Sequence, residues 1–256
     1  MMPDLNVRKQ AEASRFSHSV EAEPQLKCGL EIHQQLLTKH KLFCKCSAAF
    51  NEEPSGEIKR KLRAVAGETG EVDRAAAYEA GLERALTYKT YPGESCLVEL
   101  DEEPIGPMNR EALDTALQIA LMLNCTVPEE IEVMRKTVLD GSNTSGFQRT
   151  AVVGLAGWID ANDSKEDSKV GIQSVAVEED ACQILDKAKN VFGLSRLGIP
   201  LVEIATAPDI KTPEQAAEVA ECIGRILQST ERVRRGLGTI RQDLSVSIEG
   251  GTRCEL

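Results

Sequence analysis

Several acidic side chains of this sequence are embedded in short apolar runs, where a charged group is unusual. They are Glu31 in GLEIH, Glu179 at the end of SVAVEE, Glu203 in PLVEIA and Asp243 in IRQDLSVSI. A carboxylate that points into a sheet is costly unless it is paired or bound to a cation. His33 follows Glu31 by two residues, so both side chains share one face if this segment is a strand. Together these residues predict one shared site, provided that their strands are neighbours.

The chemistry of this predicted site follows from its ligand atoms. A set made mostly of carboxylate oxygens suits Mg²⁺ better than zinc, and magnesium in turn indicates phosphoryl chemistry with a nucleotide. The alternative is that each acid lies on the solvent face of an edge strand and that His33 is an ordinary histidine of the core or surface. Spacing along the chain does not decide between the two, because it does not show which strands are adjacent.

The cysteines suggest a second, weaker metal hypothesis. The eight cysteines follow no regular framework, and only Cys44 and Cys46 lie close together in the sequence. Structural zinc usually takes two such pairs, and the nearest further cysteine, Cys96, is single. We therefore favour reduced thiols over a zinc site here, as expected for a cytoplasmic protein.

Basic residues provide candidate phosphate contacts. Four arginines fall within ten residues, namely Arg232, Arg234, Arg235 and Arg241. They could hold phosphates or form a solvated surface beside a helix end. The whole chain is acidic, with 30 basic and 41 acidic residues and a formal charge of −11. Such a chain lacks the broad basic field of a general nucleic-acid-binding protein.

The elements that must position these side chains alternate between strands and helices without regular order. Strands are predicted at 26–36, 131–139, 171–177, 200–205 and 239–248, and helices at 73–86, 109–124 and from Thr212 onward. Residues 51–75 are expected to be irregular or surface-helical, 140–145 to form a loop, and 1–25 to form a loose arm. This order favours an α+β fold with a mixed or antiparallel sheet and flanking helices.

Size and composition restrict the class of protein further. A chain of 256 residues, 41% hydrophobic, can bury one large core or two small ones. No apolar run approaches the ~20 residues needed to span a bilayer. The N-terminal segment lacks the apolar stretch of a signal peptide. We expect a cytoplasmic protein without a membrane segment.

Taken in order along the chain, four segments resemble the GatB/GatE family. They are 29–46 (GLEIHQQLLTKHKLFCKC), 177–181 (VEEDA), 195–209 (SRLGIPLVEIATAPD) and 238–248 (GTIRQDLSVSI). Two further segments, 139–150 and 235–243, favour the archaeal-type GatE branch of that family. The resemblance covers residues 26–256 and leaves the arm 1–25 outside. It implies a glutamine-synthetase-like cradle domain with the α+β architecture.

The resemblance also implies an activity. Family members use ATP to phosphorylate the γ-carboxylate of glutamate esterified to tRNA(Gln), and ammonia then displaces the phosphate. In GatE systems an asparaginase-like partner, GatD, supplies the ammonia through an internal channel. The resemblance therefore implies an ATP- and Mg²⁺-dependent carbon–nitrogen ligase that acts on glutamyl-tRNA(Gln).

The family's site positions can be carried onto this sequence residue by residue. Its metal positions match Glu31, His33, Glu179, Glu203 and Asp243, which would hold Mg²⁺ ions between ATP and the acceptor carboxylate. Glu178 is expected to point to the face opposite Glu179. Basic positions that contact phosphate or line the channel match Arg135, Lys136 and Arg241.

Two departures from the family pattern leave alternatives open. Ser245 stands where the family carries Asn, and the family pattern continues beyond Leu256 into further cradle, insertion, helical and tail domains, where tRNA is largely held. We therefore expect an incomplete cradle domain, and its activity alone stays open. The alternatives are a non-catalytic segment that binds GatD or tRNA, and a small-molecule ATP-dependent amide ligase that uses free glutamate.

Overall fold

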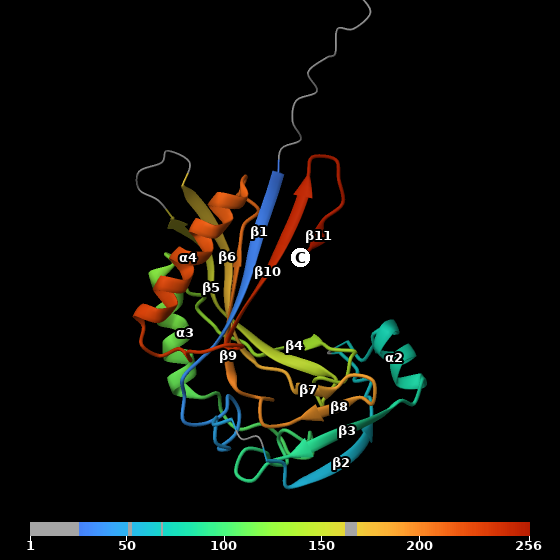
Figure 1. Ribbon diagram of the computed structural model, residues 1–256. Helices are drawn as coiled ribbons and strands as arrows, with labels where there is room; N and C mark the ends of the chain where they lie inside the picture. Colours follow the sequence, from blue (N-terminus) through green and yellow to red (C-terminus); the bar gives the residue numbers. More distant parts are fainter. Residues whose placement is uncertain (1–25, 51–52, 68, 162–167) are drawn as a thin grey trace, which may run out of the picture.

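The computed structural model describes residues 26–50, 53–67, 69–161 and 168–256 and has two sheets and three helices in these residues (Figure 1). The predicted arm 1–25 lies outside the described residues. The α+β class is confirmed. The larger sheet has the strand order β11-β10-β1-β9-β6-β5-β4, and every neighbouring pair in it is antiparallel. Its strands are β1 (Leu26–Gln35), β4 (Met134–Thr137), β5 (Phe147–Asp160), β6 (Lys169–Glu179), β9 (Pro200–Thr206), β10 (Ile240–Ile248) and β11 (Cys254–Glu255).

Two helices cover one face of the larger sheet. They are α3 (Arg110–Met122) and α4 (Pro213–Ser229), which stand on the same side of the long strands in Figure 1. Both predicted helix starts are confirmed. The Asn109 side chain accepts from the backbone N–H groups of the first turn of α3, and Thr212 accepts from that of Gln215. The buried stripes of these helices and the inward residues of the strands form one core, which leaves the other face of the sheet for polar side chains.

The longest strand, β5, was not predicted, and two glycines explain how closely α3 packs against it. A Cβ at Gly157 would lie 2.4 Å from Cys125 Sγ and from the carbonyl oxygen of Leu123. A Cβ at Gly154 would lie 2.7 Å from the Cβ of Ala120. Glycine at both positions therefore lets the end of α3 and the following turn approach the strand backbone.

The smaller sheet lies at the lower end of the long strands in Figure 1 and has the order β2-β3-β8-β7. Its strands are β2 (Gly56–Lys61), β3 (Ala85–Thr90), β7 (Gln183–Asp186) and β8 (Val191–Gly193), with α2 (Arg74–Gly81) beside them. The expectation of irregular or helical structure over 51–75 is wrong at β2. This strand is charged on its exposed face, and only Ile58 packs against the small core.

The predicted helix at 73–86 is shorter in the structure. It starts after Asp73, whose side chain accepts from the backbone N–H of Ala76, and its last residue is Gly81. Leu86 instead lies in β3 and joins a core with Tyr88 and Phe192, whose rings stack 5.6 Å apart. The predicted loop 140–145 is confirmed. The Tyr88 hydroxyl of β3 donates to the Gly141 carbonyl oxygen at 2.7 Å and so attaches the loop to the smaller sheet.

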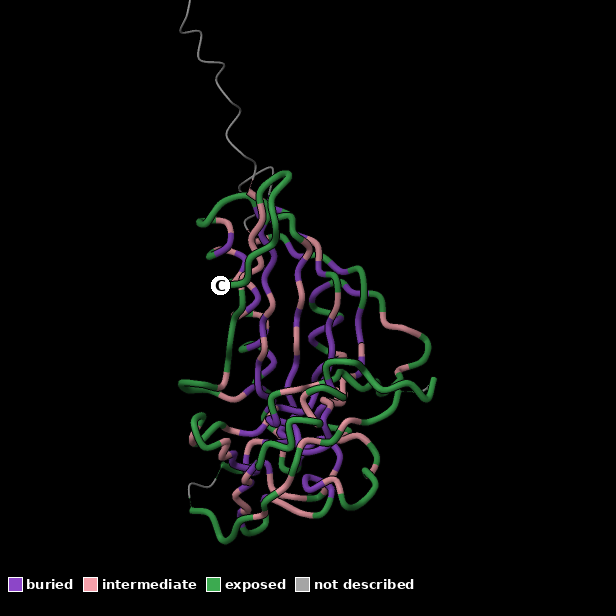
Figure 2. The backbone as a smooth tube through the Cα atoms, turned by 90° about the vertical axis from the view of Figure 1, so that its right-hand side faces the viewer, coloured by how far each residue is buried: buried purple, intermediate pink, exposed green. Residues whose placement is uncertain are grey.

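Figure 2 shows buried backbone concentrated along the central long strands, while the turn between β10 and β11 is exposed. All eight cysteines are free thiols. Within the described ranges, no helix combines the length and apolar character needed to cross a membrane.

Candidate functional site

The helix-free face of the larger sheet carries a group of acids around one histidine. Strand β1 lies between β9 and β10, and the register places His33 opposite Glu203 on one side and Glu31 opposite Asp243 on the other. Residues that face each other across antiparallel strands project to the same side of a sheet. The sequence folds in this way because the alternate residues, such as Leu30 and Ile32, are buried in the core below.

The distances bring this group together. His33 Nε2 lies 3.3 Å from Glu203 Oε2 and 3.4 Å from Glu31 Oε1. His33 Nδ1 lies 3.8 Å from Asp243 Oδ2, which is too long for a hydrogen bond. The ligand atoms of Glu31, His33 and Glu203 all lie within 4.8 Å of one another. Asp243 stands at the rim, since 62% of its side chain is exposed, compared with 12% for His33.

His33 and Glu203 form an ion pair at the centre of the group. Burial lowers the pKa of His33, but the hydrogen bond and charge of Glu203, with the charge of Glu31, outweigh it and raise the pKa overall. For Glu203, burial raises the pKa, but the contacts with His33 and with Lys136 outweigh it and lower the pKa to about 2. Glu203 is therefore ionised at every physiological pH, and it attracts any cation that enters the site.

A lysine completes this face from the far edge of the sheet. Lys136 on β4 donates to Glu178 Oε1 at 2.9 Å and to Glu203 Oε2 at 3.1 Å. Glu178 also accepts from Thr150 at 2.8 Å and from Gln148 at 3.0 Å. Burial raises the pKa of Glu178, and the neighbouring Glu203 charge adds to this effect against the opposing contacts of Lys136 and Thr150. A fully buried carboxylate with a raised pKa is thus held next to the acid group.

The structure separates two predicted neighbours, Glu178 and Glu179. Glu178 projects to the face with Glu203, whereas Glu179 projects to the other face and pairs with Arg149, with 3.0 Å between Nη1 and Oε2. Burial raises the pKa of Glu179, and Arg149 opposes that shift. The structure therefore does not bring Glu179 into the group around His33. It places Glu178 beside that group, although we expected Glu178 to point away from the metal site.

The predicted basic residues separate in the same way. Arg135 packs over the Phe147 ring, with Cζ 5.4 Å from the ring centroid, beside Arg149, which lies over the same ring. Only Lys136 of the pair reaches the acid group. Arg241, opposite His33 in the register, reaches toward Asp180, with 3.8 Å between Nη2 and Oδ1. Arg241 thus lies on the same face as His33 and is half exposed.

Asp180 lies beside this face, and the sequence had not singled it out. Its carboxylate is buried, accepts from the Gln35 amide at 2.6 Å and lies 3.8 Å from Arg196 as well as from Arg241. Its signal in the sequence was only the acidic run that it shares with Glu178 and Glu179. Arg234, another arginine of the predicted cluster, is half-buried and donates to the carbonyl oxygens of Leu36 and Ala48.

The donor set fits a magnesium ion. Two carboxylates and one imidazole converge in the group of Glu31, His33 and Glu203, and hard oxygen ligands are those that Mg²⁺ prefers. The buried Nδ1 of His33 has no hydrogen-bond partner among the described residues. A cleft of about 280 Å³ adjoins Glu31. It is lined in part by Lys27, Gln173, Ser245, Ser247 and Arg253.

Comparison with known proteins gives one consistent result. Residues 26–256 match the sequence model described as "GatB/GatE catalytic domain". The E subunit of a glutamyl-tRNA(Gln) amidotransferase from Saccharolobus solfataricus is 52% identical over 233 residues, which are 90% of this chain and 36% of that protein. A protein of Methanocaldococcus jannaschii with the same name is 53% identical over 234 residues, with the same coverage of each chain. The chain thus spans 36% of the length of these curated relatives.

Proposed function

The chain belongs to the GatB/GatE catalytic-domain family, and from this premise we propose that it carries the catalytic site for ATP-dependent amidation of glutamyl-tRNA(Gln). The observation that carries the proposal is the group of Glu31, His33 and Glu203 on the open face of the larger sheet. This group supports a magnesium-dependent phosphoryl transfer, and the names of the relatives indicate the substrate.

The proposed reaction has two steps. In the first, an oxygen of the glutamyl γ-carboxylate attacks the γ-phosphorus of ATP, and the bond to the β-phosphate oxygen breaks, which releases ADP. In the second, ammonia attacks the carbonyl carbon of the acyl phosphate and loses a proton, and inorganic phosphate leaves with the bonding pair. The first step is needed because a carboxylate is a poor electrophile, and phosphorylation gives it a leaving group.

Magnesium held by Glu31, His33 and Glu203 would neutralise negative charge on the phosphoryl oxygens. Asp243 lies at the rim, with Oδ2 3.8 Å from His33 Nδ1, and is the proposed further ligand. Glu203 stays ionised, since its pKa is lowered to about 2, and without metal its carboxylate lies against His33 Nε2, the nitrogen that would turn to the ion. Lys136 and Arg241 on the same face are positioned to bind phosphate oxygens.

Glu178 has the properties of a proton acceptor for the second step. Burial raises its pKa, which makes it a stronger base than an ordinary carboxylate. Its partner Lys136 touches both Glu178 and Glu203, so the two steps would share one strip of the sheet. Glu179 remains a proposed ligand only if the loaded site differs from the arrangement seen here.

The proposed reaction needs an ammonia source and a tRNA-binding surface in addition to this acidic chain. Ammonia would come from an asparaginase-like GatD protein, and glutamyl-tRNA(Gln) would be held mainly by protein outside these residues. Binding of the tRNA mainly outside these residues is consistent with the formal charge of −11. A domain that bound RNA through its own electrostatic field would be basic.

The test uses a chimaera, because the relatives are longer than this chain. Residues 26–256 replace the matching segment of the 53% identical Methanocaldococcus jannaschii protein, which is then produced with GatD. Amidation of glutamyl-tRNA(Gln) is measured with glutamine or ammonium as the nitrogen donor, with and without ATP and Mg²⁺. We expect glutaminyl-tRNA(Gln) only when both ATP and Mg²⁺ are present.

Two further arms separate the alternatives. If the chimaera amidates free glutamate as well as glutamyl-tRNA(Gln), the small-molecule ligase is the better description. If it binds GatD and tRNA but forms no product under any condition, while the unmodified relative is active, the segment is non-catalytic and the proposal fails.

A further inference from the structure

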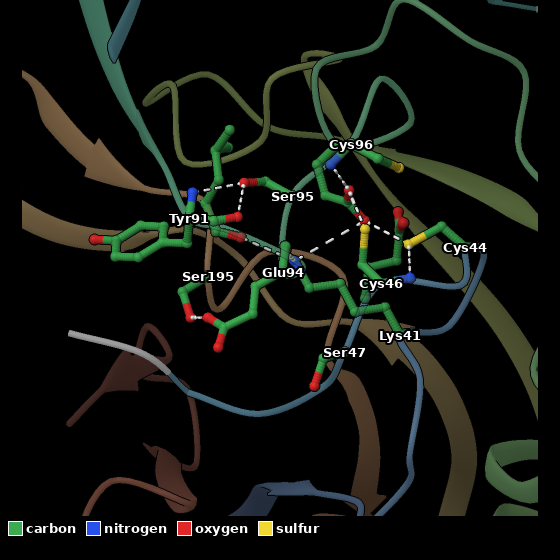
Figure 3. Close-up of polar contacts among 12 residues, drawn as sticks. Lys41, Cys44, Cys46, Ser47, Tyr91, Glu94, Ser95, Cys96 and Ser195 are labelled. Carbon is green, nitrogen blue, oxygen red and sulfur yellow. Dashed lines mark hydrogen bonds and ion pairs between the residues drawn. The ribbon is translucent and has the colours of Figure 1, made fainter. Parts of the chain in front are cut away.

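The buried carboxylates of this chain differ in their surroundings. Figure 3 shows one of them, Glu94, whose carboxylate accepts from the Ser195 hydroxyl where the segment after β3 meets the segment after β8. Glu178 is fully buried as well, but it lies beside the acid group and is in contact with Lys136 on the open face of the larger sheet. The Glu178 carboxylate therefore lies next to the proposed chemistry, and the contacts around it determine where its oxygens point.

Strand β5 supplies two of the side chains that hold Glu178. Thr150 lies directly opposite Glu178 in the ladder of β5 and β6, and Gln148 precedes it by two residues, so both project to the same face. The Thr150 hydroxyl donates to Glu178 Oε1 at 2.8 Å, and Gln148 Nε2 donates to Glu178 Oε2 at 3.0 Å. Arg149, between them, projects the opposite way and pairs with Glu179. The alternation of one strand thus gives each of the two neighbouring glutamates its own partners.

The Gln148 amide is itself anchored to the main chain. Its Nε2 also donates to the backbone carbonyl oxygen of Glu179 at 2.8 Å. Both acceptors are oxygens, so only the NH₂ end of the amide satisfies them, and both of its hydrogens are used. Because the carbonyl oxygen belongs to the last residue of β6, the amide nitrogen has a fixed position at the end of this strand and holds Glu178 Oε2 there.

The two oxygens of Glu178 carry unequal numbers of hydrogen bonds. Oε1 accepts from Lys136 Nζ at 2.9 Å and from the Thr150 hydroxyl, whereas Oε2 accepts from Gln148. Each carboxylate oxygen can accept about two hydrogen bonds. Among the described contacts, Oε1 therefore has its full set of donors and Oε2 keeps one position for a further donor. A proton that reaches this carboxylate would arrive at Oε2.

We propose that Gln148 is a positioning residue that directs Glu178 Oε2 toward the nitrogen that attacks in the second step of the reaction, an inference that rests on the proposed function. In that step the ammonia nitrogen forms a bond to the carbonyl carbon of the acyl phosphate. The bond from this carbon to the phosphate oxygen breaks, and phosphate leaves with the bonding pair. The proton that the nitrogen loses passes to Oε2 of Glu178. Gln148 acts on this transfer through the orientation of the carboxylate.

A role in orientation predicts an effect on one step of the reaction. The hydrogen bonds of the Gln148 side chain go to the two glutamates at the end of β6. The cation that assists the first step would instead be held by Glu31, His33 and Glu203. Without the Gln148 donor, Glu178 Oε2 is released from its position, and proton transfer needs an acceptor within hydrogen-bond reach. The first step should therefore persist while the second step slows.

The test compares the two steps in the chimaera. Gln148→Met keeps the length of the side chain and removes both donated hydrogen bonds. Release of ADP on glutamyl-tRNA(Gln) without a nitrogen donor reports the first step, and amidation with ammonium reports both steps. We expect ADP release and the KM for ATP to stay close to wild type, whereas kcat with ammonium should fall by about 10- to 100-fold. Gln118→Met, at an exposed position of α3, is the matched control and should change neither measurement.

Two more variants separate orientation from packing. Gln148→Glu keeps the shape of the side chain but places an oxygen against two acceptor oxygens, so it should be slower in the second step than Gln148→Met. A role in packing alone predicts that Gln148→Met equals wild type. Thr150→Val removes the other donor from β5 and should show the same separation of the two steps, which covers the case in which the Gln148 variants fail to fold.

The outcomes distinguish this inference from the proposed function. Wild-type kcat in Gln148→Met, or an equal fall in both steps, would overturn the role of Gln148 and leave the proposed amidation in place. A crystal structure of Gln148→Met should show the Glu178 carboxylate turned away from its present direction, and an unmoved carboxylate would also overturn it. A wild-type chimaera that forms no product would contradict both proposals.

Discussion

His33 Nε2 lies 3.3 Å from Glu203 Oε2, and the two residues face each other across the antiparallel strands β1 and β9. The strand ladder therefore fixes the contact, because the hydrogen bonds on either side set the register of both residues. A site built on a sheet in this way is more precise than one built on loops. Substitutions in this group should therefore act on its charges without moving the backbone that carries them.

Replacing Glu203 with glutamine should abolish most of the proposed amidation in the chimaera. The change keeps the size of the side chain but removes the charge that holds the cation and orients His33, so we expect a loss of roughly 100-fold or more in turnover. Glu214→Gln, on the first turn of α4, serves as the matched control and should be neutral. Turnover near that of the control would remove Glu203 from the site.

The ionisation of His33 offers a test on the metal-free chain. Its pKa is raised above the ordinary value of 6.5, despite burial, by Glu203 and Glu31. NMR titration of the ring protons should therefore give a midpoint above 6.5, and Glu203→Gln should lower it. A midpoint that Glu203→Gln leaves unchanged would contradict the ion pair.

The raised pKa of His33 determines how its contribution to folding stability changes with pH. The charged ring contributes stability that is fully present below the unfolded-state pKa and is lost as the pH rises through the folded-state pKa. Wild type should therefore be more stable than His33→Gln at low pH, and this difference should shrink as the pH rises past neutrality. Chemical denaturation at several pH values, with metal removed, measures the difference.

Lys136 should affect metal binding and turnover in opposite directions. Its ammonium touches Glu178 and Glu203, so Lys136→Met should strengthen Mg²⁺ binding to the isolated chain by removing a competing cation. The same variant should lower amidation in the chimaera, because a phosphate contact is lost. Lys187→Met, in an exposed turn, is the control for both measurements. Weaker Mg²⁺ binding in Lys136→Met would show that the lysine does not compete with the ion.

Alanine substitutions at two glycines should change the free energy of unfolding in opposite directions. Gly157→Ala should lower the free energy of unfolding by about 1–3 kcal/mol, because the added Cβ would overlap Cys125 and Leu123. Gly224→Ala within α4 should raise it by about 0.5–1 kcal/mol, since open space surrounds that position. Denaturant unfolding of both variants checks the signs, and a stable Gly157→Ala would show that α3 can move away from β5.

The sequence allowed the shared face of Glu31 and His33 to be predicted, because alternation along one strand is a local property. It also predicted both helix starts on the larger sheet, where Asn109 and Thr212 act as caps. Which strands are neighbours is a property of the whole fold, so the approach of Glu203 to His33 stayed a hypothesis until the register was known.

Other elements could not be predicted for physical reasons specific to each. Strand β5 was missed because its glycines, which are needed for the close approach of α3, lower its strand signal. Strand β2 was missed because a charged edge strand has only one inward apolar residue, Ile58.

The irregular pairing of β6 with β9 near Gln173 determines which acid faces the site. Val170 and Ile172 are buried before it, and Val175 and Val177 are buried after it, so the inward residues change from even to odd numbers. Deleting one residue of β6 can preserve or reverse the face to which each later side chain points. Deleting Gln173 would leave a continuous alternation with Glu178 still on the open side, whereas deleting Ala176 would transpose Glu178 and Glu179. A one-residue deletion within the irregularity therefore keeps the two glutamates on their present faces, whereas a deletion between the irregularity and Glu178 exchanges them.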